Sequence, residues 1–278
     1  MIAVELRRQV RRVRTYVSAG ILIVIPVILT LAYKFGGPPH RGRSSVVDLA
    51  SYSGLNLPLI SLSVMGPFLL AIVVSAFAGE SIAGEATWSS LRYLLVRPIR
   101  RGRLLAGKLF VSSVLSLAAV VLVVLASLAA GVIAFGWHPV LSAHVSSSAG
   151  LVGTGVKVTK ISEASALART ALSMVYVAWS LSSVIAFAFM LSTMTDKTFG
   201  AIAGGVGFAV ISQILDAISA LGSIRYGLPS HYLQAWNGLF AQPIATADMV
   251  RGALLQVPYV LVFGGIAWWW FRRKDIAS

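Results

Sequence analysis

The chain has 278 residues, of which 57% are hydrophobic and only 12% are charged, and its formal net charge is +14. Soluble globular domains carry about twice that charged fraction, so the composition indicates an integral membrane protein. The absence of cysteine excludes disulfides, thiolate metal sites and cysteine nucleophiles, and the basic residues flank apolar runs instead of forming a nucleic-acid-binding domain.

The first 16 residues predict an amphipathic helix that lies in the membrane interface. Ile2, Leu6, Val10 and Val13 recur at helical spacing, and five arginines occupy most of the remaining positions. Such a helix places its apolar face on the acyl chains and its arginines against anionic lipid headgroups. The same arginines would also serve as a basic flank that orients the first span.

Six apolar runs of 17 to 31 residues follow, and a helix of roughly 20 residues is enough to cross a bilayer. The predicted spans cover residues 17–33, 57–78, 104–134, 168–194, 201–221 and 253–271. No soluble domain remains between these runs, so residues 1–278 are expected to form one transmembrane domain. The sequence therefore predicts an all-α integral membrane protein with six transmembrane helices.

The distribution of Lys and Arg predicts the orientation of the chain. An even number of spans places both termini on one side, and 15 of the 23 Lys and Arg residues fall on that side. Because short cytoplasmic loops are enriched in these residues, both termini and the loop 79–103 are expected in the cytoplasm. The segments expected outside are 34–56, 135–167 and 222–252.

Asp216 is a carboxylate within a predicted span, and Gln213 precedes it by three residues. Ionisable residues inside spans often mark ion or substrate pathways, so this pair is a candidate pathway site. The alternative is a carboxylate at a helix end that reaches water or pairs with Arg225.

The segment before the last span carries three aromatic residues, Tyr232, Trp236 and Phe240, at a spacing of four. This spacing places them on one face of a short helix. We expect that face to anchor the segment in the outer membrane interface, with a role in gating or substrate contact as the alternative.

Residues 102–108, GRLLAGK, have the spacing of a phosphate-binding loop. Leu109 stands where the Mg²⁺-binding Ser or Thr is required, and no strand precedes the run, so no nucleotide site is predicted in this chain. The four histidines share no ligand spacing, which argues against a metal site. We expect the chain to bind no cofactor of its own and not to be an enzyme.

The loop 79–103 carries the most distinctive pattern of the chain. It combines an acidic start, a hydroxyl, a leucine run with an arginine inside it, a proline and a further arginine. The residues concerned are Glu80, Glu85, Ser90, Leu91, Arg92, Leu94, Leu95, Pro98 and Arg101. Residues 87–96 are expected to form a short helix with one apolar side, which Pro98 ends.

This pattern resembles the first cytoplasmic loop of the ABC-2 type permeases, the membrane subunits of one class of ATP-binding-cassette exporters. The resemblance implies that the loop couples to a separate cytoplasmic ATPase, which would bind ATP and Mg²⁺. It also implies a second permease subunit, as homodimer or heterodimer, and a multi-pass location in a prokaryotic plasma membrane, in contact with lipid and not with nucleic acid. The family usually has Gly-Thr where this chain has Ser89 and Ser90, so a sharp turn at Ser89 is not implied.

Two other functions remain open from the residues alone. An ion-coupled secondary transporter would depend on Asp216 and would need no ATPase. A membrane scaffold would carry no substrate at all.

Overall fold

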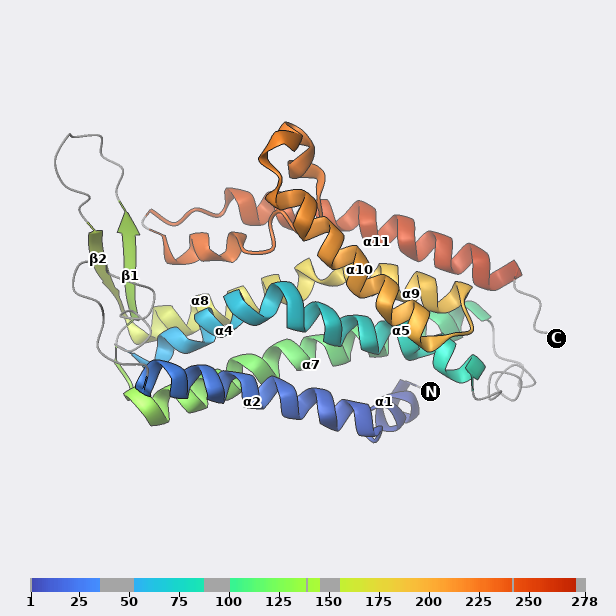
Figure 1. Cartoon of the computed structure of the whole chain (residues 1–278), viewed down its shortest axis with the longest axis horizontal. Coiled ribbons are helices and arrows are strands. Elements are labelled where there is room, and N and C mark those ends of the chain that lie inside the picture. Colours follow the sequence, from blue (N-terminus) through green and yellow to red (C-terminus); the bar gives the residue numbers. More distant parts are fainter. Residues whose placement is uncertain are drawn as a thin grey trace.

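A computed structural model of the chain describes residues 2–35, 53–87, 101–138, 140–145, 156–241 and 243–273. Its helices lie side by side along the long axis of the molecule (Figure 1). Six of the described helical segments are long and apolar enough to span a membrane, which confirms the predicted number of spans. The elements are α1 (Ile2–Val10), α2 (Val13–Phe35), η1 (Gly54–Asn56), α4 (Leu57–Met65), η2 (Gly66–Leu70), α5 (Ala71–Thr87), α7 (Arg101–Phe135), β1 (Val140–Val145), β2 (Val156–Ile161), α8 (Glu163–Ser180), α9 (Ser182–Met194), α10 (Thr198–Ala217), η3 (Ser219–Gly227), η4 (Ala235–Phe240) and α11 (Ala247–Arg273).

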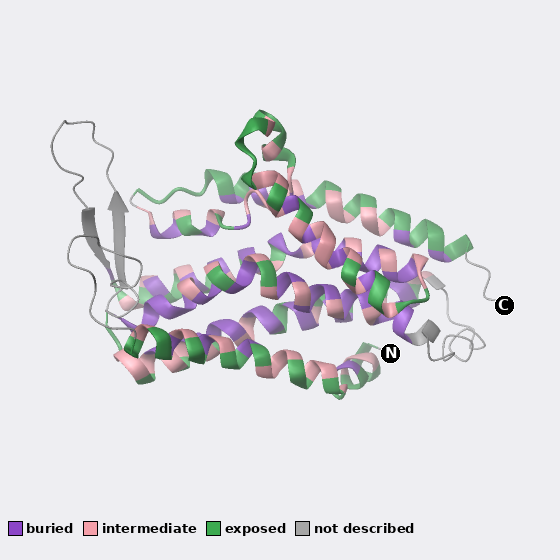
Figure 2. Cartoon of the chain, viewed as in Figure 1, coloured by how far each residue is buried: buried purple, intermediate pink, exposed green. Residues whose placement is uncertain are grey.

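Helix α5 lies at the centre of the bundle. It packs against α7, α9 and α10, while α2 covers α7 and α11 covers α9. Helices α2 and α11 therefore form opposite edges of the bundle (Figure 1). Buried residues concentrate in the central helices, whereas α2 and α11 carry mainly exposed and half-buried ones (Figure 2).

Polarity is distributed as a bilayer requires. On the edge helices Val24 and Leu261 are more than half exposed, and such residues would contact lipid. Inside the bundle Ser75, Ser127 and Ser173 are fully buried. Small and hydroxyl-bearing residues are favoured between membrane helices because they permit close approach and interhelical hydrogen bonds where no hydrophobic driving force acts.

The second span is interrupted by η2, one π-helical turn that contains Pro67. Proline has no N–H, so the carbonyl of Ser63, four residues earlier, lacks its usual helical partner. Gln234 donates its side-chain amide to that carbonyl over 3.3 Å, and Gln213 donates to the carbonyl of Pro67 over 2.5 Å. Two amides from distant segments thus satisfy backbone groups that would be costly to leave unpaired in a bilayer.

The fifth span is shorter than predicted. Helix α10 ends at Ala217, because Ile218 adopts an extended backbone (φ −83°, ψ 101°). Gly222, with a positive φ of 54°, then turns the chain within η3. The predicted end at residue 221 followed the apolar run, which continues into η3, a segment that projects from the bundle (Figure 1).

The aromatic segment before the last span packs inside the protein. Trp236 of η4 is 1% exposed and meets Phe240 edge to face, with ring centroids 6.4 Å apart. Element η4 contacts α8 and α11. The aromatic face therefore supports the bundle itself and does not lie free at the membrane interface as the spacing suggested.

The two ends of the bundle differ in structure. Strands β1 and β2 form an antiparallel hairpin, with Val140 opposite Ile161, inside the predicted outer segment 135–167. Among the described residues, this hairpin is the part of the fold that is not helical or irregular. Helix α1 and the C-terminal end of α11 both lie at the other end of the bundle (Figure 1), as an even number of spans requires. Helix α1 ends at Val10, so the predicted helix over residues 1–16 is divided by a turn before α2.

Candidate functional site

Glu80 of α5 binds the N-terminal segment of the chain. Its two carboxylate oxygens form ion pairs with Arg12 and Arg14, at the turn between α1 and α2. Arg14 also donates to the carbonyl of Ala76 over 3.0 Å and to the side chain of Gln9 over 2.7 Å. The three charged side chains are about one-fifth exposed, so their pairing offsets a substantial loss of hydration.

A second ion pair lies in the same region. Lys108 of α7 is 3% exposed, and its Nζ donates to Glu5 of α1 over 3.3 Å and to the carbonyl of Ser81 over 3.0 Å. Gln9 donates to the same Glu5 oxygen over 3.1 Å. Burial by itself raises the pKa of the Glu5 carboxyl, but the charge of Lys108 and the hydrogen bonds from Gln9 and Lys108 outweigh it, so the pKa falls below its usual value of 4.5.

We call the set Glu5, Gln9, Arg12, Arg14, Glu80 and Lys108 the N-terminal clamp. It connects α1 and the start of α2 to α5 and α7, the helices that flank residues 88–100. Ser192 of α9 extends the connection, because its hydroxyl accepts the backbone N–H of Ile82 and of Ala83 over 3.1 and 2.9 Å. One end of the bundle is therefore joined by polar contacts across α1, α5, α7 and α9.

The predicted coupling residues fall in and around this clamp. Glu80 is a member of it. Glu85 and Arg101 lie in the last turns of α5 and at the start of α7, where the backbone is described and the side chains are not. Ser90, Leu91, Arg92, Leu94, Leu95 and Pro98 lie outside the described residues.

The sequence did not reveal the partners of Glu80. From the sequence, Arg12 and Arg14 are assigned to the basic flank of the first span. Lys108 is assigned to the end of an Arg-rich loop. One feature of the sequence does point to such partners. The chain has nine acidic residues and 23 basic ones, so a carboxylate at the end of a span is expected to pair with a basic residue.

The run with phosphate-loop spacing is helical. Residues 102–108 all lie within α7, which begins at Arg101. A nucleotide-binding loop of this kind requires an irregular backbone whose N–H groups converge on phosphate, and Lys108 is instead tied to Glu5 and Ser81. Residues 102–108 therefore do not form such a loop in this structure.

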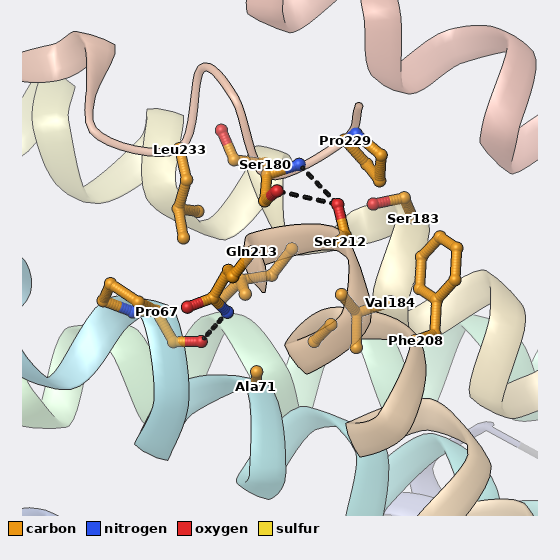
Figure 3. A pocket seen from close by; sticks show the side chains of 13 residues that line it. Pro67, Ala71, Ser180, Ser183, Val184, Phe208, Ser212, Gln213, Pro229 and Leu233 are labelled. Carbon is orange, nitrogen blue, oxygen red and sulfur yellow. Dashed lines mark hydrogen bonds between the residues drawn. The ribbon is translucent and has the colours of Figure 1, made fainter. Parts of the chain in front are cut away.

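A small pocket, mainly apolar but lined by several serines, lies where interruptions of the helices meet (Figure 3). It is lined by Pro67 of η2, by Ser180 and Ser183 at the α8–α9 junction, by Ser212 and Gln213 of α10, and by Pro229, Ser230 and Leu233 of the segment before η4. We call it the serine pocket. The centre of a water molecule can occupy about 20 Å³ of this pocket. That volume holds one or two waters and no larger ligand.

Hydrogen bonding in the serine pocket is incomplete. The hydroxyls of Ser212 and Ser230 lie 2.7 Å apart and bond to each other. Ser183 is fully buried, and its hydroxyl has no partner among the described residues. The helix is interrupted just before Ser183, because Leu181 ends α8 and donates its N–H to the carbonyl of Val177 over 3.1 Å.

The predicted pathway residues are both engaged by neighbouring groups. Gln213 holds the carbonyl of Pro67. Asp216 lies 2.5 Å from Nδ1 of His231 and 3.6 Å from Nε of Arg225. The pairing with Arg225 is the alternative raised from the sequence, whereas the contact with His231 was not foreseen because nothing in the spacing brings residue 231 back over α10.

Within the described residues, no group of three or more His, Asp or Glu side chains could hold a metal ion. The class of protein that these features define is a multi-pass membrane protein whose helices are joined by ion pairs at one end and by hydroxyls and amides in the middle. The chain belongs to a protein family of unknown function, DUF2705, whose model matches residues 17–277 and hence all six spans. A comparison with curated proteins finds no match.

Proposed function

We propose that this chain is the permease subunit of an ATP-binding-cassette exporter in a prokaryotic plasma membrane. Two permease subunits, identical or related, would form the pathway. A separate cytoplasmic ATPase would bind ATP and Mg²⁺ and would dock on the loop 79–103. Both termini and this loop would face the cytoplasm.

The observation that supports this proposal most directly is where the loop attaches. Residues 88–100 connect α5 to α7, and α5 packs against α7, α9 and α10 at the centre of the bundle. A partner that moves the loop would therefore act on the central helix directly. A ligand or partner can shift such an equilibrium only by binding one arrangement more tightly than the other, and the loop offers a surface for that difference.

The N-terminal clamp fixes the two helices that carry the loop. Glu80 of α5 pairs with Arg12 and Arg14, and Lys108 of α7 pairs with Glu5, so α1 and the start of α2 together hold both helices that flank the loop. Separating a buried ion pair is costly, because it leaves charges without partners in a poorly hydrated site. We expect α1, α5 and α7 to move as one unit when the ATPase closes.

Affinity purification in a mild detergent tests the proposal. We expect an ATP-hydrolysing subunit to co-purify in stoichiometric amount with the wild-type chain and to be lost when Leu94 and Leu95 are both replaced by Glu. The matched control is Ile244→Glu, which places an acid on an exposed apolar position just before α11, and it should retain the subunit. Substrate transport by the chain reconstituted alone would contradict the proposal, as would unchanged ATPase binding by the double variant.

The contact between Asp216 and His231 favours a second candidate, an ion-coupled carrier. An ionisable pair of this kind at the end of a span is a candidate route for a coupling ion, and His231 contacts Asp216 in the last turn of α10. This function predicts proton-driven uptake in proteoliposomes without any ATPase, and loss of that uptake in Asp216→Asn. Under the exporter proposal the same variant keeps its ATP-dependent transport.

A further inference from the structure

A groove opens between α1 and the first turns of α7. Its volume is about 640 Å³, and its lining is Ile2, Ala3, Arg103, Ala106, Gly107 and Phe110. Five of these residues are apolar or small, and among the described lining residues Arg103 is the charged one. The groove is therefore mainly apolar, with one arginine side chain in its lining.

The position of the groove along α7 places it across the edge of the bilayer. Lys108 is the last charged residue before the uncharged run 109–135, so the hydrocarbon region begins close to residue 109. Arg103 lies about 9 Å further out along the helix, at 1.5 Å per residue, which is the level of the headgroups. Phe110 is 55% exposed at the level of the acyl chains.

The charge around the groove selects for an anion. Arg103 is exposed and forms no ion pair with the described part of the chain, and the N-terminal segment carries two further exposed arginines, Arg7 and Arg11. Glu5, the acid of α1, is engaged by Lys108. A zwitterionic headgroup would bring an ammonium group without a free carboxylate to receive it, whereas an anionic headgroup would bring only charges that the arginines attract.

Gly107 lies in the lining of the groove, on α7. A Cβ built at this position would meet only Cγ1 of Ile2, at 4.0 Å, so close packing of the protein against itself does not demand glycine here. Glycine is unfavourable within a helix, and its presence is explained if a further molecule lies along this face of α7.

We propose that this groove binds one anionic phospholipid, with its phosphate on Arg103 and the first part of an acyl chain along Ala106, Gly107 and Phe110. The lipid would fill the space between α1 and α7 on the face that the N-terminal clamp leaves open. This site is independent of the transport proposal, since it requires only that the chain span a membrane.

Native mass spectrometry of the full-length protein in detergent tests the site. The protein is offered equimolar phosphatidylglycerol and phosphatidylcholine with matched acyl chains. We expect one phosphatidylglycerol per chain to be retained in preference to phosphatidylcholine. Arg103→Gln should lower this preference about fivefold, as the loss of one basic residue at a membrane surface does. Gly107→Leu should abolish retention of the lipid by filling the groove.

Two control variants match these changes. Gly20→Leu adds the same side chain to α2, where a Cβ meets nothing within 4 Å, and Arg251→Gln removes an exposed arginine from α11. Both should retain phosphatidylglycerol as the wild type does. Equal retention of the two lipids by the wild type would overturn the proposal. So would wild-type retention by Arg103→Gln, which keeps the test decisive even if Gly107→Leu fails to fold.

Discussion

Glu80 neutralises two arginines in a chain that has only nine acidic residues. Its partners lie 68 and 66 residues earlier in the sequence. The ion pairs therefore join distant segments of the chain and do not merely cap a helix. Lys108 and Glu5 act in the same way between α7 and α1. At the residue scale, Lys108 can be almost fully buried because the Glu5 carboxylate neutralises its charge.

Replacing Glu80 by Gln should destabilise the protein. Arg12 and Arg14 would keep their charges without a counterion, and because these side chains are about one-fifth exposed, we expect a loss of about 2 kcal/mol in the free energy of unfolding, below the full cost for a buried pair. Thermal unfolding in detergent measures the effect. Asp248→Asn is the control, because its pair with Arg251 is exposed on both sides and should contribute less than about 0.5 kcal/mol.

The lowered pKa of Glu5 leads to a prediction of how the stability of the protein depends on pH. Because the pKa of Glu5 is lowered in the folded protein, this group stabilises the fold above its unfolded value of about 4.5 and loses that contribution as the pH falls through the lowered value. Wild type should therefore melt at a higher temperature than Glu5→Gln at about pH 7, and the two should converge near pH 3. A difference that stays constant over this range would show that Glu5 is not ionised in the clamp.

At the scale of elements, interrupted helices determine where polar groups gather. The π-helical turn at Pro67 leaves backbone carbonyls for other partners, and side chains from α10 and from the segment before η4 donate to them. The serine pocket lies where these segments meet (Figure 3). Polar contacts of this kind hold membrane helices in one register because no water is present to replace them.

Two serines of α9 should respond differently to the same substitution. Ser192→Ala removes the acceptor of two backbone N–H groups of α5, and we expect a loss of about 1–2 kcal/mol in the free energy of unfolding. Ser183→Ala removes a buried hydroxyl that has no partner among the described residues, and should be neutral or slightly stabilising. Comparison of their unfolding temperatures checks the contrast. Equal losses would mean that the Ser183 hydroxyl is satisfied, for example by a water in the pocket.

At the scale of the whole molecule, both ends of the described chain lie at one end of the bundle and the hairpin lies at the other (Figure 1). The clamp and the groove belong to the first end. If that end faces the cytoplasm, as the distribution of Lys and Arg predicts, the loop 79–103 is accessible to a cytoplasmic partner. The sidedness is therefore the global property on which the exporter proposal depends.

The lack of cysteine allows this sidedness to be measured with single substitutions. Ala164→Cys, at an exposed position of α8 near the hairpin, should react with a membrane-impermeant maleimide added to intact cells. Lys197→Cys, at an exposed position between α9 and α10, should react only after the membrane is opened. The reverse pattern would place the loop 79–103 outside and would contradict the proposed contact with an ATPase.

Local information in the sequence determined the six spans, because apolar runs of membrane length must be helical in a bilayer whatever their neighbours are. It also identified Glu80 and Asp216 as acids of interest. Only the tertiary structure decided what those acids bind: Arg12 and Arg14 for Glu80, and His231 with Arg225 for Asp216. It likewise ended α10 at Ala217 and buried Trp236. Hydropathy and periodicity describe how a segment meets its solvent, whereas partners distant in sequence are chosen by the packing of the helices.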